Sequence, residues 1–287
     1  MNFMNELDII RILVALGGTA IGTYYDIFNK KNVPDRFLYA FLAVALLINI
    51  FDYTQFVARL PMAILIVSFL YIMYRIGQLG GADVFILAAI YSALPTIASP
   101  LLAQPQIPDY FGLPSIFPIL SISVFIFSIA IISKNLPSAI EKTLKGKVKF
   151  TLPQIAQSIL LLAAYSFTIY LFLQGPIKIS LLNTIFVTFV MFLVIFFVLY
   201  KDFVTQQMIK WKAARAVETE DVIALEALDS KFVAKYKLNR LVTEKQLKIM
   251  LRLGRKWPVL DLPMFLPYVF MALVVYLLIG DPLLYYF

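Results

Sequence analysis

The chain has 287 residues, of which 61% are hydrophobic and 15% are charged, a balance that excludes a soluble domain of this size. It contains no Cys and no His, which excludes thiol nucleophiles, catalytic imidazoles and the common zinc sites. The formal net charge of +8 is explained by basic loops on one side of a membrane, so the lipid bilayer is an expected partner, whereas no nucleic acid, metal or cofactor is expected.

Runs of about 20 apolar residues predict helices that cross a bilayer, because backbone polar groups must then pair within the segment. The sequence predicts an all-α polytopic membrane protein with about eight transmembrane helices. These runs lie at 8–28, 37–53, 60–77, 83–103, 114–133, 153–174, 178–200 and 259–280. No basic residue precedes the first run and no small-residue cleavage site follows it, so it is expected to be a retained helix rather than a signal peptide.

The basic residues are distributed unevenly between the loops. If the chain begins outside the cell, 22 of the 25 Lys and Arg lie on the cytoplasmic side, as positively charged loops usually do. Asp26, at the end of the first run, and Asp83, at the start of the fourth, then lie at cytoplasmic helix ends. Three further aspartates are expected to be solvated at outer helix ends: Asp52, Asp109 and Asp281.

The longest polar stretch is 201–257. Its piece 204–228 is predicted to continue the seventh helix. Thr243 and Gln246 match a capping box for a second helix, which Gly254 would stop. The expected domains are a transmembrane domain, a cytosolic helical subdomain too small to own much of a core, and a final transmembrane helix, at 1–200, 201–257 and 258–287. Two residues are expected to anchor this subdomain at the membrane interface: Trp211 and Trp257.

Two carboxylates at the same depth predict aspartyl hydrolysis, with Asp26 and Asp83 as the catalytic pair. An ionised Asp can take a proton from water while its protonated partner polarises the scissile carbonyl, and the two then exchange roles. Gly80, Gly81 and Ala82 precede Asp83, and their minimal side chains leave room for a peptide backbone beside it. In the structural alternative, the glycines only turn the chain into the fourth helix and Asp83 caps that helix.

Gly80-Gly81-Ala82-Asp83 resembles the Gly-x-Gly/Ala-Asp motif of the intramembrane-type aspartyl proteases. Asp26 with Lys30-Lys31-Asn32-Val33-Pro34 resembles the first-aspartate region of type IV prepilin peptidases, and Pro263-Met264-Phe265-Leu266-Pro267 resembles the start of their final helix. More specifically, the chain is similar to the archaeal branch, the preflagellin (archaellin) and prepilin peptidases. The resemblance implies an aspartic-type endopeptidase of the cell membrane that removes the short basic leader from archaellin or pilin-like precursors at the cytoplasmic face.

Two departures from this family pattern have consequences. Members of the archaeal branch usually have six crossings, so 135–176 is expected to be additional material that adds an even number of helices. Bacterial members carry a Cys-rich segment linked to N-methylation, and since this chain has no Cys, the resemblance implies peptidase activity without methyltransferase activity.

Other carboxylates could take part in substrate binding. An acidic cluster could hold the positive charge of a leader, although a solvated helix face that balances its own Lys and Arg is the preferred interpretation. Its members are Glu218, Glu220, Asp221, Glu226 and Asp229. Asp261 begins the last run at the same depth as the catalytic pair, but it lacks the glycines and is interpreted as a first-turn helix residue.

Two other classes of protein stay open as alternatives. A protease resembling presenilin or signal peptide peptidase would share the motif, but the Pro-Ala-Leu tripeptide near the end of those chains is absent here. An ion or solute transporter would carry polar residues in the middle of its helices, where the second, third, fifth and seventh runs have almost none.

Overall fold

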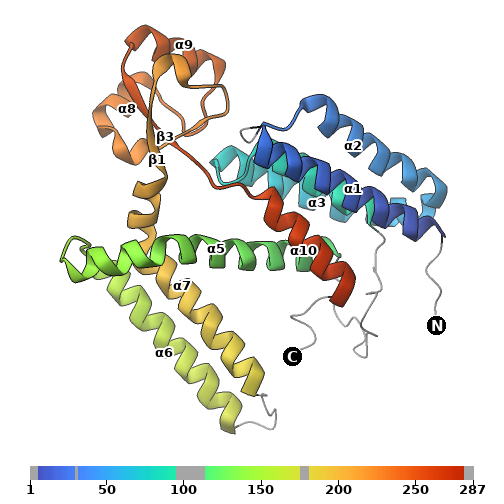
Figure 1. Cartoon of the computed structure of the whole chain (residues 1–287), viewed down its shortest axis with the longest axis horizontal. Helices are drawn as coiled ribbons and strands as arrows, with labels where there is room; N and C mark the ends of the chain where they lie inside the picture. Colours follow the sequence, from blue (N-terminus) through green and yellow to red (C-terminus); the bar gives the residue numbers. More distant parts are fainter. Residues whose placement is uncertain (1–5, 30–31, 95–113, 175–180, 281–287) are drawn as a thin grey trace.

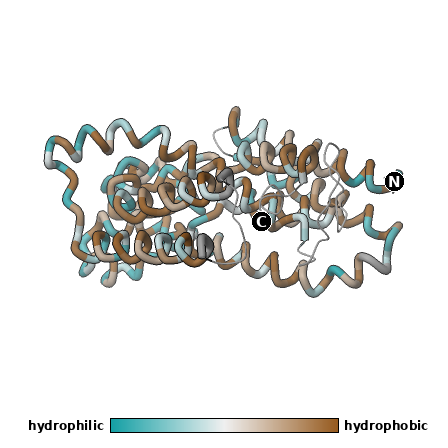
Figure 2. The backbone as a smooth tube through the Cα atoms, turned by 90° about the horizontal axis from the view of Figure 1, so that it is seen from below, coloured by the Kyte–Doolittle hydropathy of each residue, from teal (hydrophilic) through white to brown (hydrophobic). Residues whose placement is uncertain are grey.

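The computed structural model describes residues 6–29, 32–94, 114–174 and 181–280 (Figure 1). Within these ranges the chain is mostly helical, and hydrophobic residues, brown in Figure 2, run along most of the helices. Five helices are long and apolar enough to cross a membrane: Glu6–Phe28, Phe56–Ile76, Ile116–Leu144, Leu152–Leu171 and Thr184–Met208. The structure therefore agrees with the prediction of a helical membrane protein.

Three of the eight predicted crossings are shorter than expected. α2 spans Asp35–Ile48, α4 spans Gly81–Ala93 and α10 spans Leu266–Ile279, with 14, 13 and 14 residues. At about 1.5 Å per residue each is about 20 Å long, whereas the hydrocarbon core of a bilayer is about 30 Å thick. Eight full-length crossings are therefore not found among the described residues, and 95–103 of the fourth run lies outside them.

The first four helices and α10 form one bundle. α1 spans Glu6–Phe28 and α3 spans Tyr53–Ile76, and the short 3-10 helix Asn49–Asp52 (η1) joins α2 to α3. α4 packs against α1, α2 and α3, and its residues Ile86 and Ile90 are fully buried. α10 also packs against α1. The helix that follows the glycine motif is thus held on several sides.

Gly18 on α1 lets the ring of Phe41 on α2 approach the α1 backbone. A Cβ atom at Gly18 would lie 2.1 Å from this ring, whereas a Cβ atom at Gly17 would meet nothing within 4 Å. We expect Gly18→Ala to lower the free energy of unfolding by about 1–3 kcal/mol, because a buried ring must shift. Gly17→Ala should be neutral or stabilising by up to about 1 kcal/mol. Thermal unfolding in detergent measures both, and equal stability of the two variants would contradict this packing.

α5, α6 and α7 lie beside the bundle. α5 spans Ile116–Leu144 and packs against α10 and α7. α6 (Leu152–Gln174) and α7 (Leu181–Met208) contact each other and extend together away from α1–α4 in Figure 1. The prediction that 135–176 adds an even number of helices is wrong, because this range holds the end of α5 and one complete helix, α6, which pairs with α7.

A small antiparallel sheet with two short helices follows α7, and we call residues 209–260 the sheet region. Its strands are Ile209–Ala213 (β1), Val222–Ile223 (β2) and Lys256–Leu260 (β3), in the order β1-β3-β2. Its helices are α8 (Ser230–Tyr236) and α9 (Glu244–Leu253), with 3-10 turns at Ala214–Ala216 (η2) and Leu225–Ala227 (η3). The region lies between α7 and α10 in the chain. The prediction of a purely helical subdomain is wrong, because the region contains a sheet.

Two further predictions for this region are wrong. α7 ends at Met208 instead of continuing to 228, because Ile209–Ala213 alternates apolar and charged residues and pairs with β3. The region also has its own hydrophobic core, in which Trp257 is fully buried. Trp257 is therefore a core residue rather than an interface anchor, whereas Trp211 is 56% exposed.

The predicted start and stop signals of α9 are confirmed. The Thr243 side chain accepts a hydrogen bond from the Gln246 N–H at 3.3 Å, and Gly254 ends the helix with φ of 63°. The Gln246 side chain donates to the Asn239 carbonyl instead of closing a full capping box. Local sequence signals thus suffice for this helix.

Buried charge lies at the end of the bundle where α4 ends. The Arg11 side chain is 2% exposed and lies 3.6 Å from both Asp8 and Asp52. The prediction that Asp52 is simply solvated is wrong, because it pairs with a buried arginine from α1. The two other outer aspartates, Asp109 and Asp281, lie outside the described residues.

Candidate active site

Asp26 lies in the last turn of α1, and Asp83 lies in the first turn of α4. One turn away from them, Gly22 of α1 faces Ile86 of α4, since a Cβ atom at Gly22 would lie 2.5 Å from Ile86 Cδ1. Residues three or four positions apart share a face of a helix. The contact between Gly22 and Ile86 therefore turns the faces that carry the two aspartates toward each other.

The two carboxylates share one environment. Asp26 is buried, with 6% of its surface exposed, and it interacts electrostatically with Asp83. Both residues line the same cavity. Two carboxylates that share one site favour a state in which one keeps a proton while the other is charged. General acid–base catalysis by a pair of acids requires this difference in protonation.

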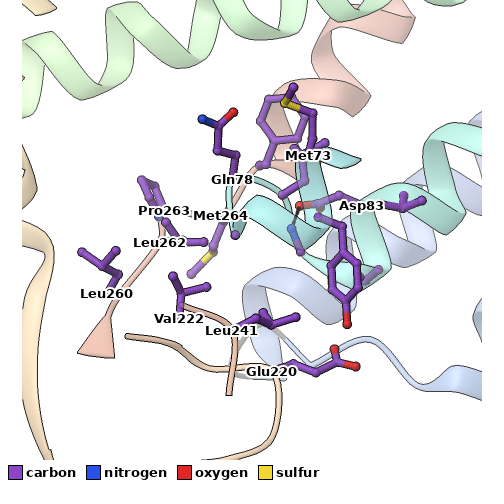
Figure 3. A pocket seen from close by; sticks show the side chains of 18 of the residues that line it. Met73, Gln78, Asp83, Glu220, Val222, Leu241, Leu260, Leu262, Pro263 and Met264 are labelled. Carbon is purple, nitrogen blue, oxygen red and sulfur yellow. Dashed lines mark hydrogen bonds between the residues drawn. The ribbon is translucent and has the colours of Figure 1, made fainter. Parts of the chain in front are cut away.

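Asp83 also has a structural contact. Its Oδ2 accepts a hydrogen bond from the Gly80 N–H at 2.9 Å, drawn as a dashed line in Figure 3. Gly80 is the N-cap residue of α4, so Asp83 supports the helix start from the third helical position rather than as the cap itself. A carboxylate can accept several hydrogen bonds, and this contact leaves acceptor capacity for a reacting water or peptide.

The glycines before Asp83 allow carboxylates to approach the backbone. A Cβ atom at Gly80 would lie 3.2 Å from Asp83 Oδ2, and one at Gly81 would lie 3.3 Å from Glu220 Oε2. Ala82 is half-buried and lines the cavity with both glycines. A side chain at Gly80 would displace the Asp83 carboxylate, and a side chain at Gly81 would displace the Glu220 carboxylate.

The cavity has a volume of about 2700 Å³ and lies between the helical bundle and the sheet region. Its walls include the loop after α3 with the first turn of α4 (77–85), the segment 217–222 and the segment 260–266 that leads into α10. Figure 3 shows Leu262 and Met264 of this last segment on the side of the cavity toward the loop that precedes α4. Sites for small molecules usually measure roughly 300–1,000 Å³, so this space is large enough for a stretch of peptide.

Asp261 has partners of its own within the sheet region. Its carboxylate pairs with Lys210 at 2.6 Å, and its N–H donates to the Met208 carbonyl at 2.8 Å. α10 begins only at Leu266, so the prediction that Asp261 lies in the first turn of the last helix is wrong, because β3 and an extended segment precede that helix. Its contacts give it a structural role in joining β3 to the end of α7.

The acidic cluster does not form a helix face, because its members lie on turns and short elements of the sheet region. Three members have local partners: Asp221 pairs with Lys212 at 3.0 Å, Glu226 pairs with Arg240, and Asp229 accepts from the Lys231 N–H. Four of the five line the cavity: Glu218, Glu220, Asp221 and Glu226. The prediction of a helix face is therefore wrong, whereas the predicted balance by nearby Lys and Arg is confirmed for Asp221 and Glu226. Binding of a leader's positive charge by these residues stays a prediction.

The sequence did not reveal the contact between Tyr74 and Glu220. Tyr74 lies in the last turns of α3, and its hydroxyl lies within hydrogen-bonding reach of Glu220, 146 positions later in the chain. No local motif predicts such a pairing, because it depends on how the sheet region sits against the loop after α3. The only signal was the place of Tyr74 three residues before Gly77, where α3 ends.

Among the residues that the structure describes, no group of three or more His, Cys, Asp and Glu is arranged to hold a metal ion. Comparison with protein-family models, with curated proteins and with solved structures finds no match for this chain. Its function is therefore inferred from the chemistry of the site.

Proposed function

We propose that this protein is a membrane-embedded aspartyl endopeptidase with Asp26 and Asp83 as its catalytic pair. The observation that carries the proposal is the meeting of these two carboxylates, from α1 and α4, at one cavity. The ionised member takes a proton from water as the water attacks the peptide carbonyl. The protonated member donates a hydrogen bond to the carbonyl oxygen and later protonates the leaving amine.

The proposed substrate is an archaellin or type IV pilin-like precursor, which combines a short basic leader with an apolar helix. An apolar helix can approach from the bilayer along the apolar helices, while the leader stays in water beside the sheet region. This proposal is supported by the lining of the cavity, which combines helices of the bundle with turns of the sheet region. The distribution of Lys and Arg supports a cytoplasmic location for the cavity.

A transporter is less well supported by the buried polar groups. Arg11 and Asp52 pair with each other, and neither lines the cavity that holds Asp26 and Asp83. An ion relay would need titratable groups spaced along one path. The buried charge at the end of the bundle away from Asp26 and Asp83 is therefore better explained by helix packing than by transport.

The proposal is tested by incubating an archaellin precursor with membranes that contain wild type, Asp26→Asn or Asp261→Asn. We expect wild type and Asp261→Asn to shorten the precursor, because Asp261 is held in a structural ion pair. Asp26→Asn should cleave about 10³-fold more slowly or not at all, because an amide cannot act as a general acid or base. Shortened precursor on a gel and its new N-terminus by mass spectrometry are the measurements.

Two outcomes would overturn the proposal. The first is an intact precursor in wild-type membranes that contain the folded protein at normal abundance. The second is equal cleavage by wild type and Asp26→Asn.

A further inference from the structure

The turn before β2 adopts a strained backbone beside residues 77–81, which we call the glycine loop. Glu220 has φ of 73°, a left-handed conformation that is unfavourable for a residue with a side chain. Hydrogen bonds between the backbones of Glu220 and Val242 and of Val242 and Asp221, both 2.9 Å long, hold the turn in place. The sheet region thus fixes Glu220 in a conformation that the residue would not choose alone.

This turn contacts both ends of the glycine loop, near Gly81 and near Gly77. The Glu220 carboxylate lies within hydrogen-bonding reach of the Tyr74 hydroxyl, and a Cβ atom on Gly81 would lie 3.3 Å from Glu220 Oε2 and 3.6 Å from Tyr74 Cε2. At the other end, Val222 Cγ1 lies 3.1 Å from the place of a Cβ atom on Gly77. Figure 3 shows Glu220 and Val222 on the side of the loop that faces the sheet region.

We propose that Glu220 is a positioning residue for Asp83, acting through Tyr74 and Gly81; this inference rests on the proposed function. Gly81 is the first residue of α4, and the N–H of its neighbour Gly80 holds Asp83 Oδ2. Holding the backbone at Gly81 therefore sets the direction in which the Asp83 carboxylate points. Displacement of a catalytic group by about 1 Å can slow a reaction by roughly 10²-fold.

A different role for Glu220 would be capture of a cationic group of the substrate, since it also lines the cavity. The two roles differ in what they require. Positioning needs an acceptor for the Tyr74 hydroxyl and needs Tyr74 itself. Charge capture needs the negative charge and does not need Tyr74.

Steady-state cleavage of the precursor by Glu220→Ala, Glu220→Gln, Tyr74→Phe and the double variant Tyr74→Phe/Glu220→Ala separates these roles. We expect Glu220→Ala and Tyr74→Phe to lower kcat about tenfold or more with little change in KM, and the double variant to be no slower than either. Glu220→Gln should keep a kcat close to wild type, because its amide oxygen still accepts from the Tyr74 hydroxyl. Glu244→Gln, the same charge change outside the cavity, is the matched control.

A second readout does not need proteolysis. Because the chain has no Cys, Ala82→Cys introduces a single thiol in the first turn of α4, and its rate of maleimide labelling reports how freely this end of the helix moves. Labelling should be faster when Glu220→Ala or Tyr74→Phe is added and unchanged with Glu244→Gln.

Unchanged labelling in all variants, or a raised KM in Glu220→Gln with normal kinetics in Tyr74→Phe, would overturn the positioning role. If wild type does not cleave the precursor but the labelling pattern is as expected, only the proposed function is overturned.

Discussion

Asp83→Asn is expected to abolish precursor cleavage while the protein stays folded. The amide oxygen of Asn can still accept the hydrogen bond from the Gly80 N–H, so the start of α4 keeps its support. The amide cannot act as a general acid or base toward water or the leaving amine, so the reaction loses one of its two carboxyl groups. We expect a loss of about 10³-fold or more in cleavage rate and a change in unfolding temperature within the error of the measurement.

Asp83→Ala is the variant that separates catalysis from helix capping. It removes both the proton exchange and the contact with Gly80, so it should lose cleavage and also about 1 kcal/mol of stability. Cleavage assays and thermal unfolding of the purified protein in detergent measure the two effects. If Asp83→Asn cleaves as wild type does and only Asp83→Ala is impaired, Asp83 supports a helix and has no catalytic role.

The helices could be predicted from the sequence because lipid-facing segments must be apolar along their whole length. Their boundaries could not, and the last crossing shows why. Val259 is apolar because it fills the core of the sheet region, yet it begins the predicted transmembrane run 259–280. The true helix starts at Leu266. Hydropathy alone does not distinguish burial in a small protein core from burial in lipid.

The sheet itself was not predictable from local pattern. β1 pairs with β3 from Ile209 opposite Leu260 to Ala213 opposite Lys256, and β2 has only two residues. Such pairings depend on contacts between segments far apart in the chain, and two residues carry no periodicity. The sequence distinguishes Glu220 only by its charge, whereas its position against Gly81 depends on how this sheet forms.

The proposed pair was predictable to a greater extent. Asp26 and Asp83 end and begin predicted helices on the same side, and that shared depth is a property of the sequence. The contact between Gly22 and Ile86 that turns their faces together is a property of packing. Charge pattern alone likewise could not reveal that Asp52 pairs with Arg11, because the two residues lie on different helices.

Arg59→Leu is expected to destabilise the protein by about 2–4 kcal/mol, because Arg59 closes the end of the helix that carries Asp83. Its guanidinium donates to the Leu94 carbonyl at 2.8 Å and to the Tyr91 carbonyl at 2.5 Å, and it lies 4.9 Å from the centre of the Tyr91 ring. The last carbonyls of a helix have no partner within the helix. Tyr91 and Leu94 are only 4% and 1% exposed, so water does not readily replace the lost donors.

Two matched variants show whether this stabilisation is specific to Arg59. Arg59→Lys keeps the charge near the helix end but lacks the two-pronged geometry, so we expect about half of the loss. Arg252→Leu removes an exposed arginine from α9 and should change the free energy of unfolding by about 0.5 kcal/mol or less. Denaturation in detergent micelles ranks the three variants. Equal stability of Arg59→Leu and Arg252→Leu would show that α4 does not depend on this contact. At temperatures where Arg59→Leu stays folded, its cleavage rate should be close to wild type, since the change lies at the far end of α4 from Asp83.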